Sequence, residues 1–166
     1  MKKLRLLLWE TCNRTCPGCC NHDWDLTALP VATLEMLSTQ DVVILTGGEP
    51  LLFPDRLHAA IRWVRKSCRA EVYIYTAKVN SLESAVGVLA AVDGITVTLH
   101  EQSDVKPFLR FADAVDGIQR SKQVNVFRGV SLSHVPSGWH SKQNVVWIPN
   151  CPLPDGETFV RMPNTF

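Results

Sequence analysis

The chain has 166 residues, 46% of them hydrophobic and 20% charged, with 17 lysines and arginines against 16 aspartates and glutamates. This composition excludes a disordered or fibrous protein, and the length suits one domain, spanning residues 1–166, with a substantial core. The net charge of +1 provides no broad positive field for nucleic acid, and no apolar run reaches the roughly 18–20 residues that cross a membrane.

Residues 1–9 begin with lysines and continue with an apolar run that ends at Glu10 without a small-residue cleavage site. We interpret this start as a first strand and expect a cytoplasmic protein. Further apolar, β-branched runs recur along the chain, which predicts six strands in all. The predicted strands are residues 4–9, 42–45, 72–75, 95–99, 124–127 and 145–148.

Segments with helical spacing lie between several of these strands. The clearest begins at Pro54 and places Cys68 on its apolar face, so we expect this cysteine in the core. Further helices are predicted at residues 31–38, 81–91 and 104–115.

Strands that alternate with helices predict an α/β fold with parallel strands. A complete eightfold barrel takes about 250 residues, so about six units in 166 residues predict an incomplete (β/α)6 barrel with its helices outside. A flat, doubly wound sheet is the alternative. In both folds, ligands bind at the carboxyl ends of the strands.

Polar and unusual residues follow the predicted strands at those ends. Cys12, Cys16 and Cys19 follow the first strand with the spacing C-x3-C-x2-C, and Gly47-Gly48-Glu49-Pro50 follows the second. Later strand ends carry Thr76 and Lys78, then His100 and Glu101, then Arg128, then Asn150 and Cys151. We therefore expect these side chains to meet at one rim.

Three thiolates this close together can bind one soft metal centre. On a four-iron, four-sulfur cluster they would leave one iron without a protein ligand, free to bind a small molecule. A structural zinc site, completed by Cys20 or His22, is the alternative for the same loop. Adjacent cysteines indicate metal or redox chemistry, so we do not expect a disulfide framework. Cys20 is either without a role or redox-active, and Cys151 either packs in the core or faces the site.

The cysteine motif after the first strand, together with Gly-Gly-Glu-Pro after the second, resembles the radical S-adenosylmethionine superfamily. The resemblance implies that the open iron binds the amino and carboxylate groups of S-adenosylmethionine. The reduced cluster then cleaves this cofactor to a 5′-deoxyadenosyl radical, which abstracts hydrogen from a substrate. A low-potential electron donor, flavodoxin or ferredoxin, is an implied partner. Gly47, Gly48 and Glu49 match the family segment that holds the methionine amino group.

By family position, the polar groups on strands three to five are candidates for binding the ribose and the carboxylate. They are Thr76, His100, Glu101, Asn125 and Arg128. The residue before the third cysteine is usually aromatic in the family and lines the adenine, whereas here it is Gly18. Trp24 or Ile148 is the candidate replacement.

The segment around Cys16-Pro17-Gly18-Cys19 is also similar to that of the activating proteins of anaerobic ribonucleotide reductase, which install a glycyl radical on a partner protein. Those proteins carry Gly-Gly-Asp-Pro and a later Asp-Gly, where this chain has Glu49 and His100-Glu101. A short barrel leaves an open mouth, which favours a macromolecular substrate such as a protein. The long stretch 129–144 is interpreted as a lid with Trp139 among its substrate contacts, or as a mobile surface loop.

Overall fold

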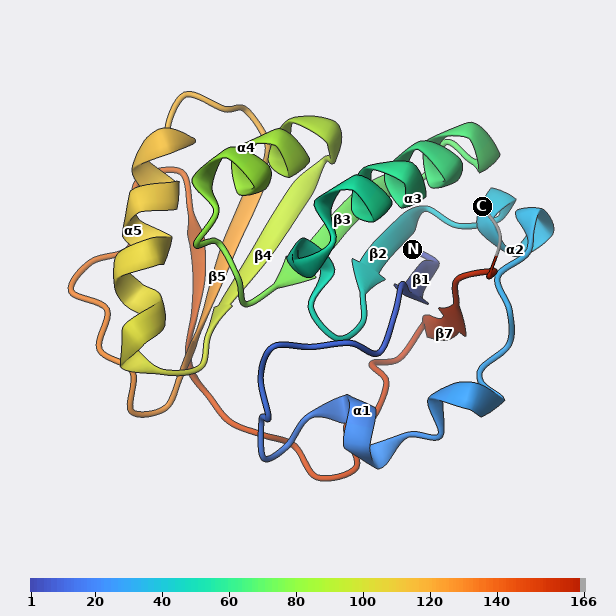
Figure 1. Cartoon of the computed structure of the whole chain (residues 1–166), viewed down its shortest axis with the longest axis horizontal. Helices are drawn as coiled ribbons and strands as arrows, with labels where there is room; N and C mark the ends of the chain where they lie inside the picture. The colour runs from blue at the N-terminus through green and yellow to red at the C-terminus, as the bar shows by residue number, and fades with distance from the viewer. Residues whose placement is uncertain (165–166) are drawn as a thin grey trace.

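The computed structural model describes residues 1–164 and has an α/β fold built on one seven-stranded, all-parallel sheet (Figure 1). The strands are β1 (Lys3–Leu7), β2 (Val42–Thr46), β3 (Glu71–Thr76), β4 (Gly94–Leu99), β5 (Ser121–Phe127), β6 (His140–Val145) and β7 (Glu157–Arg161). The α-helices are α1 (Cys20–Asp23), α2 (Leu34–Ser38), α3 (Pro54–Ser67), α4 (Leu82–Ala91) and α5 (Val105–Ala114), and short 3₁₀ turns are η1 (Leu26–Ala28), η2 (Pro50–Leu52) and η3 (Gln102–Asp104).

The order of the strands excludes the doubly wound alternative. It reads β6-β5-β4-β3-β2-β1-β7, so the chain adds each strand from β1 to β6 on the same side of the previous one. Right-handed crossovers that never reverse direction place their helices on one face of the sheet, and Figure 1 shows α3, α4 and α5 together there. β6 and β7 stand at opposite ends of the order, so the sheet is open.

The hydrophobic core lies between these three helices and the sheet. Alternate residues of each strand face it, as Leu4 and Leu6 do in β1, because successive side chains of a strand point to opposite faces. Phe108 and Phe111 of α5 are fully buried there. Cys68 packs against the core half-buried, close to its predicted place. The other face of the sheet is free to form a site.

The strand prediction is wrong in two respects, the number of strands and the position of the sixth strand. The structure has seven strands rather than six, and β7, which pairs with β1, was missed. The sixth strand is β6, which begins five residues before the predicted one. β6 is an exposed edge strand with mostly polar residues, so it has no apolar pattern to reveal it. The apolar run that suggested a strand leaves the sheet instead, with Val146 and Ile148 exposed.

The predicted lid over residues 129–144 is also corrected. Its second part is β6, and Trp139 is buried against Phe108 and Phe111 of α5 with edge-on ring contacts. Trp139 therefore belongs to the core and is not a substrate contact.

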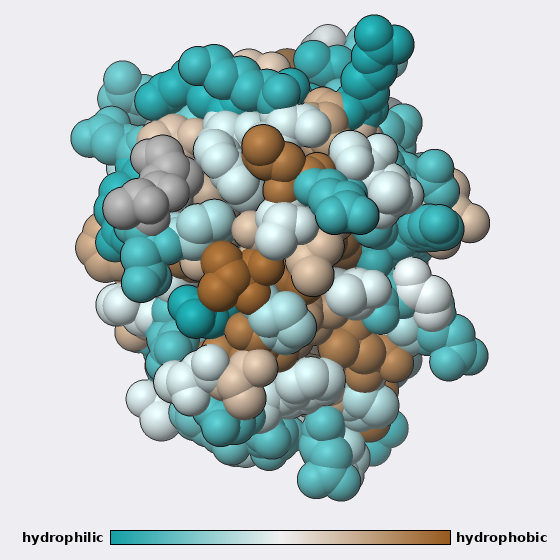
Figure 2. Space-filling view, turned by 90° about the vertical axis from the view of Figure 1, so that its right-hand side faces the viewer, coloured by the Kyte–Doolittle hydropathy of each residue, from teal (hydrophilic) through white to brown (hydrophobic). Residues whose placement is uncertain are grey.

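Figure 2 shows the side of the molecule that carries α2, with hydrophobic residues exposed in the middle of the face and hydrophilic ones around them. α2 buries Leu37 and leaves Leu34 exposed. The helix begins three residues after its predicted start, because Val31 instead bridges to Arg161 of β7. Among residues 1–164, no helix has both the length and the apolar character that crossing a membrane requires.

Candidate functional site

A cavity of about 200 Å³ opens at the carboxyl ends of the strands. It contains the residues that the two sequence motifs contribute, although these motifs lie far apart in the chain. The predicted residues that line it are Cys12, Cys16, Cys19, Gly47, Gly48, Glu49, Thr76, His100 and Cys151. The expectation that polar strand ends meet at one rim is confirmed for these residues.

The cysteine loop runs from the end of β1 to the start of α1 without regular structure. Cys12, Cys16 and Cys19 are free thiols, and the Cys19 amide donates to the carbonyl of Cys16 over 3.2 Å. Burial raises the pKa of the Cys16 thiol, and the negative charges of Cys19 and Cys12 raise it further. The three thiolates thus repel one another, and a cationic metal centre between them would relieve that repulsion.

The described residues do not form a ready site for a single ion. Within residues 1–164, no three His, Cys, Asp or Glu side chains are grouped so that they could hold one metal ion. Cys20, a candidate fourth zinc ligand, is joined in a disulfide to Cys151. The sequence led us to expect no disulfide framework, and this one pair among residues 1–164 departs from that expectation. The three remaining thiols share a cavity without converging on one point.

The two glycines after β2 allow the backbone to approach the cysteine loop closely. The amide of Gly48 donates to the carbonyl of Trp9 over 2.7 Å, and that of Glu49 donates to Thr11 over 2.9 Å. A Cβ at Gly48 would lie 2.0 Å from the Thr11 carbonyl oxygen. Gly47 has a φ of +144°, which side chains disfavour. These contacts fix the backbone immediately before Cys12.

The Glu49 side chain is 2% exposed and holds the ends of two elements together. Its Oε1 accepts hydrogen bonds from the Thr76 hydroxyl and the Leu51 amide, over 2.6 and 2.9 Å, and its Oε2 accepts one from the Ala77 amide over 2.9 Å. Burial raises the pKa of Glu49, and these hydrogen bonds and the charge of Arg14 oppose that rise. One lone pair of Oε2 is left for a ligand.

Arg14, inside the cysteine loop, was not singled out from the sequence. Its guanidinium donates through both terminal nitrogens to the carboxylate of Asp104, and to Glu101 over 3.2 Å. It also donates to the Ala77 carbonyl over 3.3 Å. Asp104 accepts from the backbone amides of His100 and Glu101 as well, so it caps this turn and anchors the cysteine loop to it. A basic residue between two cysteines of the C-x3-C-x2-C motif is a signal that could have identified Arg14.

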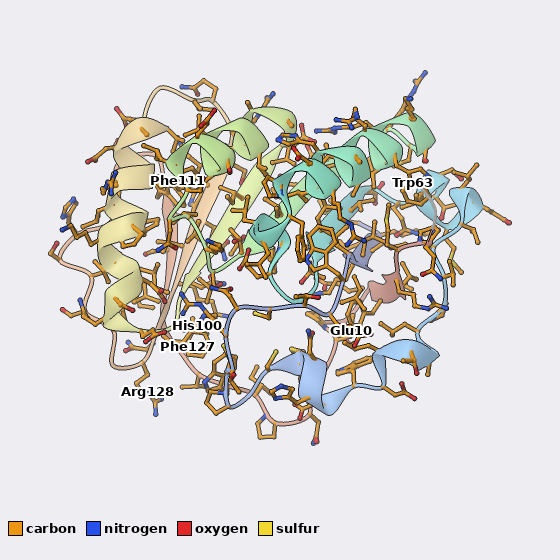
Figure 3. All side chains as sticks on the ribbon, in the orientation of Figure 1. Glu10, Trp63, His100, Phe111, Phe127 and Arg128 are labelled. Carbon is orange, nitrogen blue, oxygen red and sulfur yellow. A yellow bond between two sulfur atoms is a disulfide. The ribbon has the colours of Figure 1, made fainter. Side chains whose placement is uncertain are left out.

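His100 lies in an aromatic cluster at the end of the sheet. Its ring stacks on Trp147 with centroids 5.1 Å apart and lies 4.7 Å from Phe127. Figure 3 shows His100 and Phe127 side by side, with Arg128 pointing away from them. Burial lowers the pKa of His100, and the positive charge of Arg14 adds to this effect. Its Nδ1 is buried and has no hydrogen-bond partner among residues 1–164.

Gly18 makes room for Trp147, which comes from the other end of the chain. A Cβ at position 18 would lie 2.6 Å from the Trp147 side chain. The space beside the third cysteine is thus occupied by an aromatic ring that the sequence did not place there. Trp24 also lines the cavity, whereas Ile148 is 60% exposed and does not.

Five other predicted residues lie outside the cavity lining, Lys78 and Asn150 among them. Glu101 is exposed and pairs with Arg14. Asn125 is half-buried within β5 and accepts a hydrogen bond from Gln123 over 2.8 Å. Arg128 is exposed beyond the end of β5.

The cavity floor contains a charged group that sequence reasoning missed. Arg5 of β1 forms an ion pair with Glu157 of β7 and lies 5.5 Å from the centroid of the Tyr75 ring. Arg5 stands between Leu4 and Leu6, and this alternation of polar and apolar residues could have identified it as facing away from the core.

No family model matches the chain, and no curated protein matches it with significant similarity.

Proposed function

We propose that this chain is a radical S-adenosylmethionine enzyme. In this proposal the open parallel sheet is an incomplete barrel, and Cys12, Cys16 and Cys19 bind a four-iron, four-sulfur cluster. One observation carries the proposal: the glycine-rich segment after β2 is hydrogen-bonded to the backbone leading into Cys12, so that both motifs line one cavity. When bound, the cluster and cofactor supply reductive cleavage to methionine and a 5′-deoxyadenosyl radical, which takes a hydrogen atom from a substrate.

The donor set suits a cluster better than a single ion. In a cluster each thiolate binds a different iron, so the sulfurs stand further apart than around one zinc ion. The three free thiols share a cavity without forming a single-ion group, and the disulfide withdraws Cys20 from zinc ligation. Burial and the neighbouring thiols raise the pKa of Cys16, and the positive charge of Arg14 opposes this rise.

Residues around the cavity offer matching contacts to the cofactor. The free lone pair of Glu49 Oε2 can accept from an ammonium group, and Nδ1 of His100 is available to a ribose hydroxyl or a carboxylate. Trp147 over Gly18 provides the aromatic wall for adenine that the family usually supplies from the loop itself. The ribose and carboxylate assignments of Glu101, Asn125 and Arg128 lack such support, since these residues do not line the cavity.

Product formation by cysteine variants tests the proposal. Protein reconstituted with iron and sulfide without oxygen, then reduced, is expected to convert S-adenosylmethionine to 5′-deoxyadenosine. Cys12→Ala, Cys16→Ala and Cys19→Ala should each lose this activity and bound iron, because the cluster loses a ligand. Cys68→Ala is the matched control, since Cys68 is also a free cysteine but lies at the end of α3.

Undiminished 5′-deoxyadenosine formation by Cys12→Ala would refute the proposal. Tightly bound zinc that is lost as readily in Cys20→Ala as in Cys16→Ala would support the structural zinc site instead.

A further inference from the structure

A second pair of cysteines lies beside the three of the cysteine loop. Cys20 begins α1, and Cys151 follows β6; they form a disulfide across 131 residues with their Cα atoms 5.3 Å apart. That separation is ordinary for a disulfide. Both residues are half-buried and both line the cavity. The proposed cofactor chemistry uses neither of them.

The disulfide holds one segment against the cavity. We call residues 146–154 the covering segment; it joins β6 to β7 without regular structure. Figure 1 shows it running along the lower edge of the molecule beneath α1 before the chain rises to β7. Trp147, Cys151, Pro152, Leu153 and Pro154 line the cavity. The covering segment therefore forms one wall of the cavity.

Few hydrogen bonds hold the covering segment in place. The Trp24 indole donates to the Cys151 carbonyl over 3.1 Å, and the Glu157 amide donates to the Pro154 carbonyl over 3.1 Å. At its other end, the Trp147 ring packs against His100 and Phe127. The backbone bond from the Cys151 amide to Ile148 lies within the segment itself. A segment with so few hydrogen bonds to its neighbours opens at low cost.

The backbone of the covering segment also needs a restraint. Cys151 has a positive φ of 37°, a region that residues other than glycine and asparagine disfavour, and it follows Asn150 with a φ of 61°. A covalent tie at Cys151 keeps the chain in this conformation. Without that tie, the segment gains both conformational freedom and a more favourable backbone.

We propose that the Cys20–Cys151 disulfide is a redox latch that controls access to the cavity. A dithiol reductant opens it: one thiolate attacks the disulfide and forms a mixed disulfide, and the second thiolate resolves it. Two electrons and two protons pass to the pair, which becomes two thiols, while the dithiol is oxidised to a disulfide. The part of the covering segment from Cys151 to Pro154 then leaves the cavity, while Trp147 stays packed against His100 and Phe127, and the mouth opens to a large substrate or partner. The reverse exchange with the oxidised, disulfide form of that dithiol takes up the two electrons and two protons and closes it again.

Hydrogen exchange of the full-length protein tests the latch. Amides of the covering segment are compared in oxidised protein, in protein treated with a dithiol, and in Cys151→Ser. We expect exchange of this segment to be faster by about tenfold or more after reduction and in Cys151→Ser, which a dithiol should not change further. Cys68→Ser is the matched control and should respond to the dithiol as the unaltered protein does.

Two results would overturn the latch. One is an equal exchange rate of the covering segment before and after reduction. The other is the absence of a dithiol-sensitive link between Cys20 and Cys151 in peptide mass spectra of alkylated, oxidised protein. Unchanged exchange in β3 and β4 of Cys151→Ser verifies that the variant is folded. The readout does not depend on 5′-deoxyadenosine, so a failure of the latch is distinguishable from a failure of the proposed enzyme activity.

Discussion

Gly48 illustrates what individual residues contribute to this site. The family resemblance assigned Gly48 to a segment that holds a ligand, and the structure adds a different partner, since the Thr11 carbonyl oxygen would lie 2.0 Å from a Cβ at this position. Glu49 likewise supports Leu51, Thr76 and Ala77 besides any ligand it binds. The sequence motif could identify both residues as candidate site residues. It could not identify their contacts with Thr11, Thr76 and Ala77, because these contacts join segments that are distant in the chain.

His100 makes a pH-dependent contribution to stability. Burial holds its pKa below the ordinary 6.5, so the unfolded chain binds a proton at higher pH than the folded one. The contribution of neutral His100 to the free energy of unfolding is therefore fully present above pH 6.5. It is lost as the pH falls below 6.5 towards the pKa of His100 in the folded protein. We expect His100→Phe, which keeps an aromatic ring against Trp147, to lose less stability over this range than the unaltered protein.

Urea unfolding at about pH 7.5 and about pH 5.5 measures this difference. The free energy of unfolding should fall more in the unaltered protein than in His100→Phe. Parallel pH profiles for the two proteins would contradict a buried, neutral His100.

At the scale of elements, burial decided which predictions succeeded. The central strands β2, β3 and β4 lie within one residue of their predicted ends at both sides, because their apolar runs are continuous or alternate clearly. The edge strands β6 and β7 bury at most one residue each, so no continuous apolar run marks them. Trp139 was mistaken for a lid residue because only the tertiary fold places it against α5.

A second prediction concerns the ion pair between Arg14 and Asp104, which joins the cysteine loop to the turn between β4 and α5. Arg14 and Asp104 form a nearly buried ion pair, and removing one partner of such a pair costs about 3 kcal/mol of unfolding free energy. We expect Arg14→Gln to show a loss of this size and to bind less iron on reconstitution, since the loop before Cys16 is freed.

Arg65→Gln is the matched control. Arg65 pairs with Asp93 at the far end of α3, where both side chains are about one-third exposed, so its loss should cost less than about 1 kcal/mol. Chemical unfolding of both variants measures the contrast. Equal losses, or an unchanged iron content in Arg14→Gln, would contradict an anchoring role for Arg14.

At the scale of the whole molecule, strands added in one direction bring motifs from all parts of the chain to one edge of the sheet. The sequence predicted this convergence, since carboxyl ends of parallel strands share an edge. It did not predict the covering segment, because Trp147 and Cys151 reach the cavity after leaving the sheet. Nor could it pair Cys20 with Cys151, because the connectivity of cysteines does not follow from their spacing.

The proposed function requires that the cysteine loop binds a cluster with an open iron in the cavity where the two motifs meet. Electron paramagnetic resonance of oxygen-free, reduced protein, with and without S-adenosylmethionine, tests this most directly. We expect the signal of a four-iron cluster, and we expect it to change when the cofactor is added, because the open iron gains ligands. Reconstituted protein with no cluster signal and with tightly bound zinc would contradict the proposed function.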